Sequence, residues 1–277
     1  MTEHPRAGTP AAEPSPGAAQ AAFAFLNGWA DRIFVVSLAR ATERRARMRE
    51  RLAGLDFRFL DATDKLDLDR ARIRAEGICD ERRTPRAFRH KREMPVGAVG
   101  CSLSHRRIYE EMVRNGWRRT IVLEDDVVPV AAALGALPDA VRQLPPSWEL
   151  CYLGYLGNEE VTARARLKQA AYVALAPLRL VRWRTGEALR LLPRPFSANL
   201  RRAGRHLCTH AYALTLEGAR KLLAAQTPVA FYSDQLLAYL VLGGRLDAYV
   251  THPIFFDQET LAGIAPGAGA PASYIHG

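Results

Sequence analysis

Three consecutive carboxylates, Glu124, Asp125 and Asp126, follow the apolar run Thr120–Leu123 and are the residues of this chain best suited to chemistry. An apolar run that ends in charge is typical of a buried parallel strand, and ligands bind at the carboxyl ends of such strands. Adjacent carboxylates repel one another unless a cation is present, and their oxygens suit Mg²⁺ or Mn²⁺. On extended backbone Glu124 and Asp126 point the same way and could share one ion. The alternatives are a solvated acidic turn, or a turn beginning at Asp125 that separates the two side chains.

An anion site is predicted after the first expected strand, Ile33–Leu38, which leads into a helix ending near Ala53. Backbone N–H groups at a helix start, combined with arginines, bind phosphate. Ser37 and Leu38 end the strand, and the loop and first helical turn carry Arg40, Arg44 and Arg45. These three arginines either contact phosphate or belong to a solvated helix face. The solvated face is the expectation for Arg47, Arg49 and Arg51.

Ser104 and His105 lie on the longest expected helix, Pro95–Gly116, whose first half is rich in small residues. Small residues permit close approach of backbone, either to a sheet or to a ligand. A single histidine on a helix more often packs or lies at the surface than catalyses a reaction. The small-residue context makes Ser104 and His105 candidates for a site.

Two further acids stand at the ends of expected elements. Asp61 ends the second expected strand, Phe57–Ala62, where it could bind a ribose or a base, or could simply occupy a turn. Asp234 lies in the first turn of an expected helix, Phe231–Val241. The helix dipole explains a carboxylate there as well as a catalytic role does.

The composition is that of a soluble globular protein with an excess of positive charge. The chain has 277 residues, 48% of them hydrophobic, and a net charge of +10, which suits an anionic partner. Cys79, Cys101, Cys151 and Cys208 are far apart and predict free thiols; metal-finger spacings and phosphate-loop motifs are absent. A membrane span and a signal peptide are not expected, so a cytoplasmic location is the default prediction.

A single domain is predicted over residues 29–260, between a disordered N-terminal tail at 1–28 and a flexible tail at 261–277. Within it, Arg164–Arg205 carries eleven Lys or Arg and one acid, Glu187. We expect this basic excursion, at about residues 160–205, to be a lid outside the core. The overall class is α/β, a mostly parallel sheet flanked by helices.

Five stretches in order resemble glycosyltransferase family 25, the lipooligosaccharide galactosyltransferase family that includes the collagen galactosyltransferases. They are IFVVSLARATERR (33–45), FRFLDAT (57–63), GAVGCSLSHRRIY (97–109), IVLEDDVV (121–128) and THAYALTLEGARKLL (209–223), followed by Asp234. The resemblance spans about residues 33–252. It implies a GT-A-like fold, a UDP-sugar donor, usually UDP-galactose, Mn²⁺ or Mg²⁺, and inversion at the anomeric carbon.

The resemblance also assigns roles by position. It implies Glu124 and Asp126 as metal ligands, with His252 as a third because some GT-A enzymes use a late histidine, and Asp234 as general base. His105 is the second catalytic candidate. The donor-binding candidates are Ser37, Leu38, Arg40, Arg44, Asp61, Ser104 and Asp125. Family members usually have Asn where this chain has Ser37, which weakens the assignment of an amide hydrogen bond there.

The leading hypothesis is a metal-dependent inverting glycosyltransferase that moves a hexose, galactose by preference, to a bacterial surface glycan such as lipooligosaccharide. The basic excursion would then meet the acceptor glycolipid or anionic lipid at the cytoplasmic face of the inner membrane. One alternative is a nucleotidyl- or phospho-transferase with the same acids. The other is a non-catalytic polyanion-binding protein, for which the charge is the main argument, although no nucleic-acid motif is present.

Overall fold

The computed structural model describes residues 16–89, 93–260 and 262. Its centre is a mixed eight-stranded sheet in the order β2-β1-β3-β8-β5-β9-β7-β6. The β2-β1-β3 part and the β5/β9 pair are parallel, whereas β8, β7 and β6 run antiparallel to their neighbours. The strands of this sheet are β1 (Arg32–Ser37), β2 (Arg58–Asp61), β3 (Arg119–Glu124), β5 (Leu150–Leu156), β6 (Arg194–Pro195), β7 (Leu200–Arg202), β8 (Leu207–Thr215) and β9 (Ala248–Thr251). A separate antiparallel pair joins β4 (Val127–Pro129) to β10 (Phe256–Gln258).

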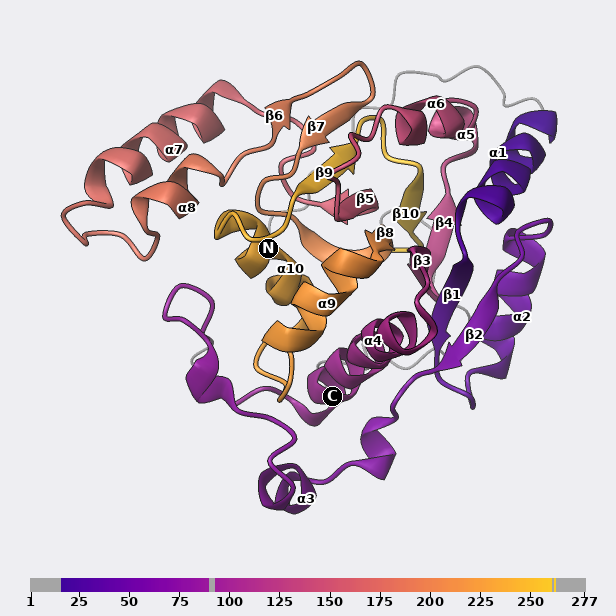
Figure 1. Cartoon of the computed structure of the whole chain (residues 1–277), viewed down its shortest axis with the longest axis horizontal. Coiled ribbons are helices and arrows are strands. Elements are labelled where there is room, and N and C mark those ends of the chain that lie inside the picture. The colour runs from indigo at the N-terminus through magenta and orange to yellow at the C-terminus, as the bar shows by residue number, and fades with distance from the viewer. Residues whose placement is uncertain (1–15, 90–92, 261, 263–277) are drawn as a thin grey trace.

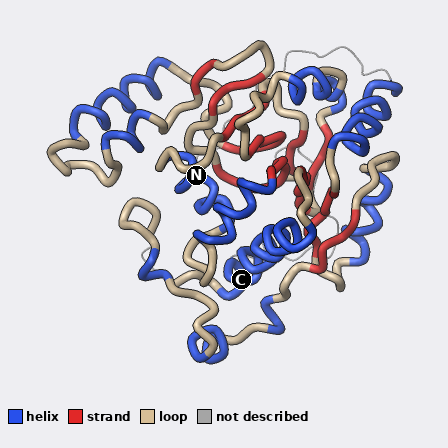
Figure 2. The backbone as a smooth tube through the Cα atoms, viewed as in Figure 1, coloured by secondary structure: helices blue, strands red, loops and turns tan. Residues whose placement is uncertain are grey.

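Helices cover both faces of the sheet (Figures 1 and 2), which confirms the α/β class. The helices are α1 (Pro16–Trp29), α2 (Thr42–Arg51), α3 (Arg70–Ala75), α4 (Val96–Asn115), α5 (Ala131–Leu134), α6 (Leu137–Arg142), α7 (Ala163–Leu175), α8 (Thr185–Leu189), α9 (Leu216–Ala225) and α10 (Ser233–Leu242). Two short 3-10 turns, η1 (Lys65–Asp67) and η2 (Glu81–Arg83), complete the described elements.

The strands are buried on both faces because their side chains alternate between two apolar clusters. Phe34 and Val122 pack with α4, α9 and α10 on one face. Their neighbours Val35 and Leu123 pack with α1, α2, α5 and α6 on the other. This is why the strands are near-continuous apolar runs in the sequence rather than alternating ones.

Strand direction determines which residues meet at the edge of the sheet. β1 and β3 are parallel, so Ser37 and Glu124 end at the same edge. β8 is antiparallel to β3, with Leu123 opposite Ala211, so the first residues of β8 lie beside the acidic triplet. The sheet therefore places the start of β8 where the sequence predicted ligand chemistry.

The predicted N-terminal tail at 1–28 is wrong for residues 16–28, which belong to α1. Phe23 and Leu26 of this helix are buried, and the ring of Trp29 stacks on Trp148 at 5.6 Å between centroids. The Ala-rich composition that suggested disorder instead forms a helix that packs against α5 and α6. Residues 1–15 and most of the predicted C-terminal tail, 261 and 263–277, lie outside the described residues.

The basic excursion is only partly the lid that its composition predicted. Leu200 of β7 is buried, and this strand pairs with β9 as part of the main sheet. The first half of the basic excursion, α7 and α8, is a helical hairpin that projects from the sheet (Figure 1).

The four cysteines are free thiols as expected. Among the described helices, none combines the length and apolarity needed to cross a bilayer.

A glycine in β5 gives a test of how tightly the site edge is packed. A Cβ at Gly154 would overlap the carbonyl oxygen of Phe256 and the ring of His210. We expect Gly154→Ala to destabilise the fold by about 1–3 kcal/mol, measured by thermal unfolding, because the backbone of β10 must move. Gly28→Ala in α1 is the control, since its new Cβ meets nothing within 4 Å and alanine favours a helix. Equal melting temperatures for Gly154→Ala and wild type would contradict this packing.

Candidate functional site

The three consecutive acids face three different sets of partners. β3 ends at Glu124, and Asp125 and Asp126 form a turn before β4. The strand alternation that would have aligned Glu124 with Asp126 therefore stops before Asp126. Which of the acids holds an ion stays a prediction, but the local geometry distinguishes them clearly.

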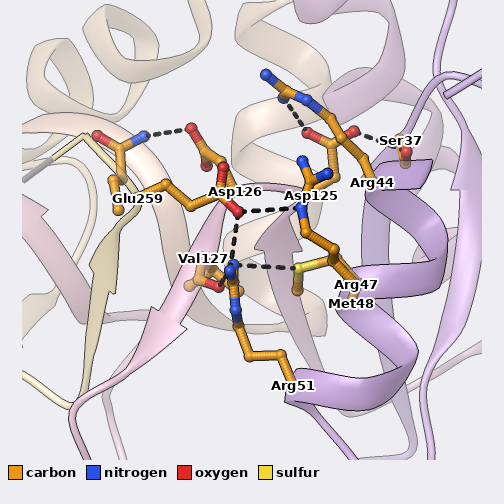
Figure 3. Close-up of polar contacts among 10 residues, drawn as sticks. Ser37, Arg44, Arg47, Met48, Arg51, Asp125, Asp126, Val127 and Glu259 are labelled. Atoms are coloured by element: carbon orange, nitrogen blue, oxygen red, sulfur yellow. Dashed lines mark hydrogen bonds and ion pairs between the residues drawn. The ribbon is translucent and has the colours of Figure 1, made fainter. Parts of the chain in front are cut away.

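Asp125 is the acid that is fixed by protein partners on both carboxylate oxygens (Figure 3). Ser37, which is buried at the end of β1, donates its hydroxyl to Oδ2 at 2.7 Å. Arg44 of α2 donates to Oδ1 at 2.8 Å. The loop between β1 and α2 is thus fastened to the end of β3, and the sequence prediction that Ser37, Arg44 and Asp125 belong to one site agrees with this contact.

One face of α2 carries arginines toward a second buried carboxylate, Glu259. Arg51 donates to Glu259 at 2.8 Å and to the carbonyl oxygen of Val127 at 2.8 Å, while Arg47 lies 3.6 Å from Glu259 (Figure 3). The expected solvated face is therefore wrong for Arg47 and Arg51. The missed signal was the spacing of Arg44, Arg47 and Arg51, three and then four residues apart, because residues at that spacing share a helix face. Arg49 instead lies over the ring of Phe59.

Asp126 is the acid that best fits a cation. Its Oδ1 is buried and has no hydrogen-bond partner within the described residues, while Gln258 reaches Oδ2 at 3.5 Å. Burial and the neighbouring charges of Glu124 and Asp125 raise the pKa of Asp126 to about 7. A buried carboxylate oxygen that lacks a partner is costly, and a hard divalent ion would satisfy Oδ1.

Glu124 is held from two sides by buried groups. The hydroxyl of Thr209, at the start of β8, donates to Glu124 Oε1. His105 Nε2 lies 3.7 Å from the same oxygen, and His105 Nδ1 is 2.9 Å from the hydroxyl of Tyr212. Burial lowers the pKa of His105, but Cys101 and Glu124 outweigh it and raise that pKa to about 9. His105 is 1% exposed, and its ring contacts Glu124 and Tyr212 inside the fold.

Asp234 approaches the same acids from the other half of the chain. It is in the first turn of α10, and its Oδ2 accepts the backbone N–H of Cys208 at 3.4 Å. Burial and the charge of Glu124 raise the pKa of Asp234, against the lowering effect of that N–H and of Arg205. Cys208 has a left-handed φ of 63° and is followed by Thr209, the donor to Glu124. Neither residue was a candidate in the sequence, because no motif marks the irregular start of β8.

The remaining donor candidates form ion pairs along the loop side of α2. Arg40 pairs with Asp64, and Arg45 pairs with Asp61 and also donates to the carbonyl oxygen of Ser37. Leu38 is half-buried at the start of this loop and its carbonyl oxygen accepts from Ala41. The cationic groups of Arg40 and Arg45 thus remain close to the edge where the strands end.

Ser104 has a structural connection in place of the predicted ligand contact. Its buried hydroxyl donates to the carbonyl oxygen of Gly100 at 2.8 Å and accepts the N–H of Thr63 at 2.8 Å. A Cβ at Gly100 would lie 2.7 Å from the carbonyl oxygen of Thr63. The small residues of α4 therefore let the segment after β2 approach the helix, as their composition indicated.

His252 does not join the acidic triplet. It follows β9, is exposed, and donates its backbone N–H to Asn199 at 2.9 Å. The pKa of His252 is lowered by partial desolvation and by Arg201, against the raising effect of Glu160. Across residues 16–89, 93–260 and 262, no group of three His, Cys, Asp or Glu side chains is arranged as a metal centre. The protein groups that fit an ion are Asp126 and its neighbour Glu124.

Comparison with known proteins shows which family the chain resembles. The model of glycosyltransferase family 25 (LPS biosynthesis protein) matches residues 30–237, which include Asp125, Asp126 and Asp234. A glycosyltransferase 25 family member of Anopheles gambiae is 34% identical over 70% of this chain and 28% of its own length. The human inactive glycosyltransferase 25 family member 3 is 35% identical over 71% of this chain and 29% of its own.

The human procollagen galactosyltransferase 2 is 29% identical over 70% of this chain and 28% of its own length. The chain thus spans less than a third of the curated relatives it matches. Among solved structures, the apo form of mouse xyloside xylosyltransferase 1 is similar, with a TM-score of 0.39 and 14% identity over 83% of this chain and 77% of that one. On the match of the family model over residues 30–237, the chain belongs to glycosyltransferase family 25.

Proposed function

We propose that this protein is an inverting, metal-dependent glycosyltransferase that transfers galactose from UDP-galactose to a hydroxyl of a glycan. The observation that carries the proposal is the meeting of Asp234 and Glu124 at the Cys208–Thr209 segment. It brings a buried carboxylate with a raised pKa next to the acidic end of β3. The name of the human procollagen galactosyltransferase 2 supports galactose as the hexose.

In this mechanism Asp234 is the general base. Its carboxylate accepts the proton of the acceptor hydroxyl, and the hydroxyl oxygen forms a bond to the anomeric carbon. The bond from that carbon to the diphosphate breaks, and its electron pair leaves with the nucleoside diphosphate. Attack from the face opposite the leaving group inverts the configuration. The N–H of Cys208 orients the carboxylate, while burial keeps its proton affinity high enough to act as a base.

The charged groups of the β1–α2 loop suit the diphosphate end of the donor. Arg40 and Arg44 would meet its phosphates by exchanging part of their present carboxylate contacts. Asp126 and Glu124 would hold Mn²⁺ or Mg²⁺, which neutralises charge on the leaving diphosphate when bound. The positioning contact of His105 keeps Glu124 in place for that role.

The acceptor that we propose is a bacterial surface glycan such as lipooligosaccharide, and the reaction would take place on the cytoplasmic side of the inner membrane. The description of the family as an LPS biosynthesis protein supports this class of acceptor. The eukaryotic relatives named above make a protein-linked acceptor the comparison to include in any assay.

Donor and base are tested together by measuring hexose transfer and donor hydrolysis across UDP-sugars. We expect turnover with UDP-galactose and a decrease in kcat of about 10²–10⁴-fold in Asp234→Asn, because the amide cannot accept the proton. Glu217→Gln is the matched control, since this exposed carboxylate on α9 pairs only locally with Arg220. Full activity in Asp234→Asn would assign the base elsewhere. Absence of turnover with every UDP-sugar in a folded protein would place this chain with the relatives named inactive.

The raised pKa of Asp234 predicts a pH dependence. A base must be deprotonated to act, so kcat/KM of the wild type should decrease as the pH falls through the raised pKa of Asp234. The decrease should begin at a higher pH than an ordinary aspartate allows. An Asp234→Glu variant should shift the midpoint of this acid limb, because the longer side chain changes the burial of the carboxylate. An acid limb that stays at the same pH in Asp234→Glu would mean that another group controls it.

Metal binding is tested by thermal unfolding with UDP in the presence and absence of Mn²⁺. We expect Mn²⁺ to raise the melting temperature of the wild type by several degrees, since a ligand that binds only the folded state stabilises it. Asp126→Asn should abolish most of this increase. Asp139→Asn, an exposed carboxylate paired locally with Arg142, should leave it unchanged. An undiminished Mn²⁺ effect in Asp126→Asn would exclude Asp126 as a ligand.

A further inference from the structure

The helix α7 has an apolar face that no described part of the chain covers. None of its thirteen residues is fully buried, and Tyr172 and Val173 attach it to the core by partial burial. Leu167, Ala171, Ala174 and Leu175 have the spacing of one helix face, and all four are exposed. Leu167 is 74% exposed. A helix with exposed leucines on one face and basic residues around them is typical of interfacial helices.

The connection from α7 to α8 continues this apolar surface. Leu178 and Leu180 are 67% and 68% exposed, and Leu189 at the end of α8 is also exposed. Of the seven exposed large hydrophobic side chains in the part of the chain that the structure describes, five lie between Leu167 and Leu189. Single exposed leucines are ordinary, whereas a group of them on one projecting element indicates a binding surface.

The same element carries a strong positive charge. Between Ala163 and Arg184 the chain has six Lys or Arg and no acid. A cavity of about 620 Å³ opens beside the α7–α8 connection, and four of its lining residues are Arg86, Arg179, Arg182 and Arg184. Leu180 and Trp183 also line it, and none of the described residues that line it is a carboxylate. The cavity therefore offers arginines for a phosphate next to Leu180 for an apolar chain.

The hairpin is anchored, so its exposed leucines are not the result of a loose segment. Trp183 is buried, with its ring edge-on to Phe88 at 5.6 Å between centroids. Gln169 of α7 donates to the carbonyl oxygens of Ala188 and Leu189, which ties the two helices together. The apolar and basic groups are thus presented on a fixed support that projects away from α1 and α2 (Figure 1).

We propose that the α7–α8 hairpin, residues 163–189, docks on a membrane surface that contains anionic phospholipid, with its leucines in the interface and its arginines on lipid phosphates. The sequence expectation of membrane contact used charge alone, whereas the exposed leucines and the arginine-lined cavity specify the surface and its chemistry. Arg205 connects this surface to the candidate site, because its guanidinium lies 5.9 Å from the centroid of the Trp183 ring and interacts with the charge of Asp234. If the proposed function holds, docking would present a lipid-linked acceptor toward Asp234; the docking itself does not depend on it.

Flotation of the full chain with vesicles tests the proposal. We expect the wild type to float with vesicles of phosphatidylcholine containing about one third phosphatidylglycerol, and not with phosphatidylcholine alone. The double variant Leu178→Ser/Leu180→Ser and the double variant Arg179→Gln/Arg182→Gln should each lower the partition coefficient by at least about tenfold. The matched controls are Leu66→Ser, an equally exposed leucine outside the hairpin, and Arg142→Gln on α6. All changes are at exposed side chains, and thermal unfolding verifies that each variant is folded.

Three results would overturn the proposal. The first is wild type that stays in the bottom fraction with anionic vesicles. The second is Leu178→Ser/Leu180→Ser that floats as well as wild type, which would leave a purely electrostatic surface. The third is weak vesicle binding together with tight binding of duplex DNA that Leu178→Ser/Leu180→Ser does not reduce. That result would identify a nucleic-acid surface instead. Loss of vesicle binding in both hairpin variants but not in the controls supports membrane docking whether or not the protein transfers galactose.

Discussion

The concentration of negative charge at one edge of the sheet is the constraint on which the site depends. Glu124, Asp125, Asp126 and Glu259 are brought close to one another in partly buried positions, where repulsion and desolvation both act against folding. The arginines of α2 compensate two of these four carboxylates, Asp125 and Glu259. Removing one partner of such a pair leaves a buried charge uncompensated, which is more costly than the pair itself is stabilising. Asp126 is left as the acid that a cation would complete.

The antiparallel strand β8 makes one site out of two distant parts of the chain. Because it runs against β3, its first residues reach the end of β3, where Thr209 contacts Glu124 and Cys208 contacts Asp234. The left-handed backbone of Cys208 is energetically unfavourable for a residue with a Cβ, and such conformations are found most often beside functional sites. The positions of Asp234 and the acidic triplet are therefore coupled through two residues.

The arginines of α2 and those of the α7–α8 hairpin lie in physically different surroundings. Arg44, Arg47 and Arg51 neutralise carboxylates inside the fold, and β7 within the excursion completes the sheet. The arginines of the α7–α8 hairpin have exposed leucines beside them and no carboxylate among the residues of their cavity. Net charge alone does not distinguish these roles, because it does not show which cations have a carboxylate within reach.

The sequence by itself determined the α/β class, the order of most elements and the acidic end of β3, because buried strands and amphipathic helices leave local patterns in apolar residues. It also grouped Ser37, Arg44 and Asp125, which contact one another in the structure, while their role in binding a donor stays a prediction. The prediction of a tail failed for α1, because its Ala-rich composition resembles that of a tail. The prediction that His252 joins the acids did not anticipate its neighbours, which are Arg201 and Glu160. Only the tertiary structure decided that Asp234 and Glu124 bind the adjacent residues Cys208 and Thr209, since this depends on the direction of β8. Strand direction and side-chain orientation in turns are set by packing between distant segments, which no local pattern records.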